Sequence, residues 1–140
     1  GFDQKYTIYA QSFDKQRNIL DSTKPVEVYS GAPPAVSIVS PKDNDYFSPE
    51  QKIILQSKLS PTNDGIAKVE FQIKDASNDI IKKCPSYHSD RLGIYSCLWR
   101  APNKLNQTYF IQAVSYAKQS SYYGQKTPAS YSEIVMVNVK

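Results

Sequence analysis

The sequence predicts an all-β fold, and more narrowly an antiparallel β-sandwich. The clearest observation is strict alternation in "IAKVEFQIKD", where Val69, Phe71 and Ile73 point to one side and the charged or polar residues between them point to the other. The second is that short strand patterns alternate with turn clusters such as "SGAPP", "SPKDND", "SPTNDG" and "RAPNKLNQ". The third is that no segment carries the apolar stripe of an amphipathic helix.

Nine segments carry the strand pattern. They are residues 6–12, 25–29, 35–39, 51–58, 66–74, 79–84, 94–100, 107–117 and 132–139. Pro33, Pro34 and Pro41 flank the third segment, which suits an edge strand because proline cannot donate a hydrogen bond to a neighbouring strand. The best helix-like fragment, "FDKQRNIL", is short and lies where a loop between strands is expected. About seven of these strands are enough to build one sandwich.

One stretch of sequence occurs twice. The segment "KYTIYAQSFDKQ" (residues 5–16) returns as "TYFIQAVSYAKQ" (residues 108–119), with Tyr6 matching Tyr109 at a constant offset. The second copy directly precedes the final strand of the predicted sandwich. The first copy is likewise followed by one more strand, "PVEVY". An offset of about one domain length is typical of tandem repeats.

The repeat predicts the division into domains. Residues 1–32 are expected to be the last two strands and the linker of a preceding domain, and residues 33–140 a complete domain of the same kind. The same offset places Pro25 on Pro128. We expect residues 5–30 to form a hairpin outside the sandwich. Because an isolated hairpin is marginal in water, its edge should pair with a neighbouring sandwich or with a second chain as a strand-exchanged dimer.

Composition and charge exclude several classes of protein. The net charge is +4 and the pI about 9.0, but the lysines and arginines are scattered and no basic helix or aromatic-basic motif is present. We therefore predict no nucleic-acid partner. No apolar run reaches the length of a membrane span, so we predict no direct membrane insertion. No signal peptide is visible, and we expect that a leader has been trimmed.

The two cysteines, Cys84 and Cys97, bracket "PSYHSDRLGIYS". This spacing can join two strands through a disulfide, which predicts an exported protein that is extracellular, on the cell surface or periplasmic. The alternative is a pair of reduced thiols buried as small apolar side chains. One histidine and two cysteines are too few for a structural zinc site, and we predict no metal and no cofactor.

A family resemblance rests on five motifs. These are "VSIVSPKDNDYF", "KIILQSKL", "DGIAKVEFQI", "YSCLW" and "YFIQAVS", in that order. Through them, residues 34–139 resemble the bacterial immunoglobulin-like, fibronectin-III-like repeats that occur in tandem in large exported proteins. The resemblance implies an immunoglobulin-like antiparallel β-sandwich with no catalytic activity.

The chain departs from that family pattern at three places. Asn106 and Gln107 stand where the family often has a glycine before the tyrosine, and Ala117 stands where it often has an aspartate. The cysteine pair is not a general family feature. The departures leave the predicted fold intact and weaken any inference that a loop function is shared.

Alternation also predicts the core. Tyr109 and Ile111 should point inward from one strand, and Val69 and Phe71 from another. Trp99 is in phase with Tyr95 and Cys97, which makes it the expected bulky centre of the core.

Catalysis is not predicted. His88 is the only histidine and lies in the polar loop "PSYHSDR", where Asp90 and Ser86 or Ser89 could be grouped with it as a triad. Neighbours in one loop rarely reach triad geometry, and the sequence has no oxyanion motif or nucleophile elbow. We interpret His88 as an exposed loop residue.

Two turn clusters could supply oxygen ligands to calcium. Residues 43–45 (Asp-Asn-Asp) and 63–65 (Asn-Asp-Gly) carry suitable side chains. The same residue types form ordinary turns through local hydrogen bonds, and no EF-hand pattern is completed.

Two functional hypotheses follow. The first is a non-catalytic spacer in a tandem array of a bacterial cell-surface or secreted protein, whose partners are the neighbouring immunoglobulin-like domains. The alternative is an adhesion or carbohydrate-binding module that contacts a host protein or glycan through a tyrosine-rich loop, with Tyr122, Tyr123 and Tyr87 as contacts.

Overall fold

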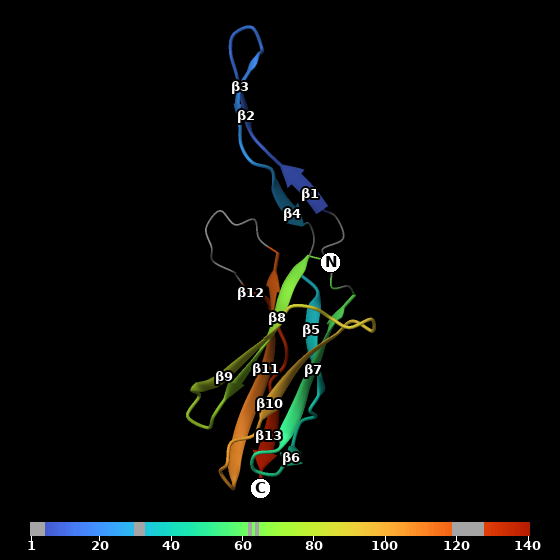
Figure 1. The fold of residues 1–140 in the computed structure, drawn as a ribbon, viewed down its shortest axis with the longest axis vertical. Coiled ribbons are helices and arrows are strands. Elements are labelled where there is room, and N and C mark those ends of the chain that lie inside the picture. The colour runs from blue at the N-terminus through green and yellow to red at the C-terminus, as the bar shows by residue number, and fades with distance from the viewer. Residues whose placement is uncertain (1–4, 30–32, 62, 64, 119–127) are drawn as a thin grey trace.

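The computed structural model describes residues 5–29, 33–61, 63, 65–118 and 128–140. The described residues contain strands and turns and no helix, so none of them forms a helix that could cross a membrane. Figure 1 shows two parts: a long sandwich that ends at the C-terminus, and a hairpin arm that extends from the opposite end. The all-β prediction is confirmed.

The sandwich has two sheets. The smaller sheet has the order β10 (Ile94–Arg100), β7 (Lys52–Ser60), β5 (Ala35–Ser40). The larger sheet has the order β6 (Asp45–Phe47), β13 (Val135–Val139), β11 (Gln107–Ala117), β8 (Ile66–Lys74), β9 (Ile80–Ser86), and β12 (Pro128–Tyr131) also pairs with β11. Every pairing is antiparallel except that of β6 with β13, which is parallel. The edge position predicted for β5 is confirmed.

Three predicted strands have the observed bounds, namely β8, β10 and β11. The last predicted strand, residues 132–139, is divided into β12 and β13, because Ser132 leaves the ladder to bond Ala113 with its side chain. The short strand β6 was missed. It follows a turn cluster, and its three residues give too little alternation to identify a strand.

The core lies between the two sheets. Trp99 and Tyr109, from opposite sheets, meet edge to face with ring centroids 5.6 Å apart. Ile111, Val69 and Phe71 are fully buried around them. The five residues expected inside are therefore packed in one cluster, and the partly buried Cys97 contacts it from the edge.

A disulfide joins the two sheets at one side of the sandwich. Cys84 lies on β9 and Cys97 on β10, the edge strands of the larger and the smaller sheet, and their Cα atoms are 6.1 Å apart. The bridge closes the side of the sandwich at which no backbone ladder connects the sheets. Of the two states left open by the sequence, the structure has the disulfide.

The arm is a hairpin in two ladder segments. Next to the sandwich, β1 (Lys5–Ile8) pairs with β4 (Val26–Tyr29), and towards the tip β2 (Gln11–Phe13) pairs with β3 (Ile19–Ser22). At the tip, the Asp14 carboxylate accepts the backbone N–H groups of Gln16 and Asn18. This local capping explains why the helix-like fragment forms a turn and the strand β3.

Candidate interaction surfaces

The arm reproduces the hairpin that β11 forms with β12 and β13. Both hairpins are antiparallel, and both shift register before their last pair, between Ser12 and Phe13 in the arm and between Ser115 and Tyr116 in the sandwich. The equivalent pairs, arm first, are Tyr6–Val28 and Tyr109–Val137, Ile8–Val26 and Ile111–Val135, Ser12–Asp21 and Ser115–Ser130, and Phe13–Ile19 and Tyr116–Pro128. The likeness thus extends from sequence to strand register.

A pair of hydrogen bonds marks the same break in both hairpins. In the arm, Ala10 N donates to Thr23 Oγ1 at 2.8 Å, and Thr23 N donates to the Ala10 carbonyl at 2.8 Å. In the sandwich, Ala113 N donates to Ser132 Oγ at 2.9 Å, and Ser132 N donates to the Ala113 carbonyl at 2.9 Å. A hydroxyl thus replaces a carbonyl as the acceptor at the corresponding position, although threonine stands in one copy and serine in the other.

The matched register corrects one detail of the sequence repeat. The position equivalent to Pro128 is Ile19, because these residues pair with Tyr116 and Phe13 respectively. Pro25 instead corresponds to Ile134, since each directly precedes the last strand of its hairpin. A single offset fails for the second strand because more residues separate β11 from β12 than β2 from β3.

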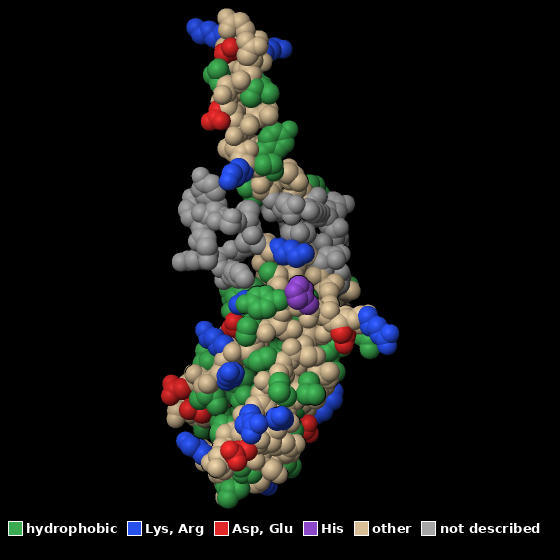
Figure 2. All heavy atoms as spheres, in the orientation of Figure 1, with side chains coloured by type: hydrophobic (Ala, Val, Ile, Leu, Met, Phe, Trp, Pro, Cys, Tyr) green, Lys and Arg blue, Asp and Glu red, His purple; other side chains and the backbone are tan. Residues whose placement is uncertain are grey.

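The two hairpins differ in what covers them. Ile111 is 0% exposed and Tyr109 is 4% exposed, whereas the equivalent Ile8 is 56% and Tyr6 is 48% exposed. Apolar side chains continue along the arm at Tyr9, Phe13, Ile19 and Leu20, all of them exposed. Figure 2 shows these side chains as green atoms along the narrow arm. The arm therefore carries the inward face of a sandwich hairpin without a facing sheet.

The tyrosine-rich binding loop can be placed only in part. Tyr122 and Tyr123 lie outside the described residues. Tyr87 follows β9, is 54% exposed and lines a hollow of about 510 Å³ with His88 and Tyr95 among its other residues. The structure thus shows Tyr87 at the surface, and the three tyrosines remain a prediction as a ligand site.

His88 is exposed in the loop between β9 and β10 and is not part of a catalytic triad. Asp90 Oδ1 accepts the backbone N–H groups of Leu92 and Ile94, so this carboxylate caps its own turn. Ser86 Oγ donates to the backbone carbonyl of His88 at 3.3 Å. These contacts hold the shape of the loop and align no nucleophile with the imidazole.

The Asp-Asn-Asp cluster holds the first part of the sandwich against the last strand. Asp43 Oδ1 accepts the backbone N–H of Met136 at 2.8 Å, and Asp45 Oδ2 accepts that of Lys42 at 2.9 Å. Asn63, from the other cluster, donates to Ser89 Oγ, whereas Asp64 lies outside the described residues. Within the described part of the chain, no three His, Cys, Asp or Glu side chains form a metal-binding group.

A basic groove of about 600 Å³ lies between the sheets where β9 and β10 diverge. Four cations line it, Lys52, Lys82, Arg100 and Lys104, together with aliphatic and aromatic side chains of both sheets. The one carboxylate in the lining, Asp75, accepts two backbone N–H groups of its own turn. Elsewhere on the face in Figure 2, lysine and arginine side chains are spread over the surface.

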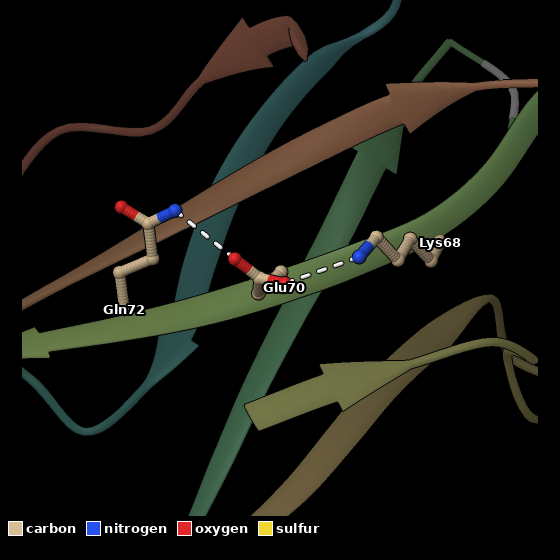
Figure 3. Close-up of polar contacts among 3 residues, drawn as sticks. All are labelled: Lys68, Glu70 and Gln72. Atoms are coloured by element: carbon tan, nitrogen blue, oxygen red, sulfur yellow. Dashed lines mark hydrogen bonds and ion pairs between the residues drawn. The ribbon is translucent and has the colours of Figure 1, made fainter. Parts of the chain in front are cut away.

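A buried carboxylate on β8 was not anticipated from the sequence. Alternation predicts that Glu70 faces outward, yet only 7% of its surface is exposed. Figure 3 shows its two oxygens held by Lys68 and Gln72, with Lys68 Nζ 3.1 Å from Oε2 and Gln72 Nε2 3.1 Å from Oε1. Lys68 Nζ also lies 4.6 Å from the centre of the Tyr116 ring. The outer face of this sheet is therefore a polar network rather than a solvated surface.

The network makes stability depend on pH. Burial by itself would raise the pKa of Glu70, but the hydrogen bonds from Gln72 and Lys68 and the charges of Lys68 and Lys83 lower the pKa below its ordinary value. A lowered folded-state pKa stabilises the fold above the unfolded-state pKa of about 4.3, and this stabilisation is lost as the pH falls through the folded-state pKa. We expect urea midpoints to fall with pH in this acidic window.

Two variants test the assignment to Glu70. In Glu70→Gln the acid-dependent part of the stability should shrink. In Lys68→Met the carboxylate loses its ion pair, so the loss of stability should begin at a higher pH than in the parent. Identical pH profiles of the urea midpoint for all three proteins would contradict the account.

Comparison with known proteins agrees with this architecture. The family model described as a bacterial Ig domain matches residues 34–113, which is more than half of the chain. A structure of the fibronectin(III)-like modules of Clostridium thermocellum CbhA aligns at 18% identity with a TM-score of 0.47, covering 75% of this chain and 96% of that one. A search of curated proteins gave no match. With its two-sheet sandwich and the family match, the chain belongs to the bacterial immunoglobulin-like domain family.

Proposed function

We propose that the chain is a non-catalytic spacer module of a tandem array in an exported bacterial protein. The observation that carries this proposal is the path of the chain through the sandwich. The arm and β5 lie at one end of the long axis and the C-terminus at the other (Figure 1). Units connected in this way add their lengths end to end, which is what a stalk requires.

The connections at the ends support a role under tension. The strand nearest the start of the sandwich that pairs with the last strand, β6, runs parallel to β13. Around it, Asn44 N donates to the Met136 carbonyl at 2.7 Å and Lys140 N donates to the Phe47 carbonyl at 2.9 Å. Pulling the two ends apart shears these bonds together instead of opening them one after another. The family is typically non-catalytic, which is consistent with this role.

The disulfide supports export and gives the module a measurable length. Disulfides persist in oxidising compartments such as the cell surface, the medium or the periplasm. When a bridged domain unfolds under force, the 13 residues between Cys84 and Cys97 cannot extend. At about 3.5 Å per residue, reduction should lengthen the unfolded chain by about 40 Å. Single-molecule extension with and without reductant measures this difference.

Two matched variants test the mechanical role. Asp43→Ala removes the bond from Met136 N and should lower the unfolding force, because that bond lies on the sheared connection. Asp75→Ala removes a comparable carboxylate cap from a turn that lies off this path, and should leave the force unchanged. Equal forces for both variants, or extension without a resolved unfolding peak in the parent, would overturn the spacer proposal.

A further inference from the structure

We infer that the arm is the final hairpin of a second immunoglobulin-like unit, and that the free edge of β1 and β2 takes a strand of that unit from the same polypeptide. The inference deepens the proposed function, on which it rests, by identifying the partner of the arm. Its basis is internal: the sandwich contains the same hairpin in its completed state, so the sandwich shows what the arm lacks.

The edge to be filled is defined by the neighbours of β11. In the sandwich, β11 is flanked by β13 on one side and by β8 on the other. In the arm, β1 and β2 have β4 and β3 on one side, and no other described strand pairs with them. The vacant side therefore corresponds to the side on which β8 lies.

The register of β8 predicts the residues that the missing strand must present. Ile111 pairs with Ile73, Ala113 with Phe71 and Ser115 with Val69. Through the matched register, the positions opposite Ile8, Ala10 and Ser12 should carry three large apolar side chains at every second residue. Polar side chains should stand between them, as they do in β8.

The facing sheet can be described in the same way. Trp99 of β10 contacts Tyr109 on the inward face of β11. Tyr6 takes the place of Tyr109 in the arm and is about half exposed. A bulky side chain of a second sheet should therefore cover Tyr6 and Ile8, which have no such cover in the described chain.

A preceding part of the same polypeptide fits this vacancy better than a second copy does. In a second copy, β8 is already paired on both edges, with β11 and with β9. In the sandwich, only residues 101–106 separate the end of β10 from the start of β11, so the facing strand is covalently close to the hairpin. Intramolecular docking over so short a connection has a high effective concentration.

A duplicated chain tests the inference. Residues 34–106 of this protein, joined directly ahead of residues 4–140, place strands β5–β10 before the arm at the spacing found in the sandwich. We expect the arm to complete a second sandwich, so that amide exchange in β1–β4 slows at least about 100-fold relative to the parent chain. The natural sandwich, monitored in the same sample, serves as the folding control.

Adjacent residues of the arm provide matched variants of the duplicated chain. Ile8→Asp places a charge where the fully buried Ile111 stands in the sandwich, and should abolish the gained protection. Tyr9→Asp changes the neighbouring position, equivalent to the partly buried Gln112, and should keep it. In the parent chain neither variant should change the melting of the sandwich.

Three results would overturn the inference. One is an unprotected arm in the duplicated chain while the natural sandwich remains protected. Another is equal protection in the two aspartate variants. The third is concentration-dependent dimerisation of the parent chain that protects the arm, which would assign the edge to a second copy. The force measurements concern only the sandwich, so the spacer role can fail or hold independently of these outcomes.

Discussion

Replacing Trp99 with alanine should lower the free energy of unfolding of the sandwich by about 3–5 kcal/mol. The side chain is 4% exposed and meets Tyr109 edge to face, so the substitution removes apolar burial and leaves a cavity between the two sheets. For a domain of this size, the melting midpoint should fall by roughly 15–30 °C. Urea unfolding at constant temperature measures the same loss.

The neighbouring residue provides the control. Leu98 lies on the same strand but is 56% exposed, so Leu98→Ala should cost less than about 1 kcal/mol. Similar losses for the two variants would show that the tryptophan does not occupy the centre of the core.

Reducing the Cys84–Cys97 disulfide should cost about 3 kcal/mol in the chain-entropy model, because the bridge closes a loop with a sequence separation of 13 residues. The midpoint of thermal unfolding should then fall by roughly 10–20 °C. The bridge joins the edge strands of the two sheets, and we expect the reduced chain still to fold, since the hydrophobic cluster does not depend on it.

The double variant Cys84→Ser/Cys97→Ser controls for effects of the reductant. Its midpoint should match that of the reduced parent and should not change when reductant is added. An unchanged midpoint in the parent under reductant, or two free thiols detected by mass in the untreated protein, would contradict the disulfide.

The alternation of apolar residues predicted the core well. In β8 and β11 every second side chain faces the other sheet, and this pattern correctly placed Phe71, Ile111 and Trp99 inside. The predicted sandwich follows because inward faces of this kind can be buried only against a second sheet.

The outer face of the larger sheet was not predictable in this way. Glu70 has the charge of an exposed residue, and its burial depends on Lys68, Gln72 and the neighbouring strand β11, whose register the sequence does not specify. Similarly, β6 follows turn residues and forms only because β13 offers a free parallel edge. Both features arise from tertiary contacts.

The repeat was visible in the sequence, but its structural meaning was not. Sequence matching aligned Pro25 with Pro128, whereas the strand registers align Pro25 with Ile134. The bonds of Ala10 with Thr23 and of Ala113 with Ser132 join different residue types, so identity alone cannot detect them.

Residue-resolved amide exchange of the 140-residue chain tests the central claim most directly, namely that one complete sandwich carries the detached final hairpin of another. We predict that the amides of β7, β8, β10, β11 and β13 exchange together, at the rate of global unfolding, and that Cys84–Cys97 reduction accelerates them together. Amides of β1–β4 should exchange orders of magnitude faster and should not respond to reduction. Protection of the arm equal to that of β11, lost at the same denaturant concentration, would show a single cooperative unit and contradict the account.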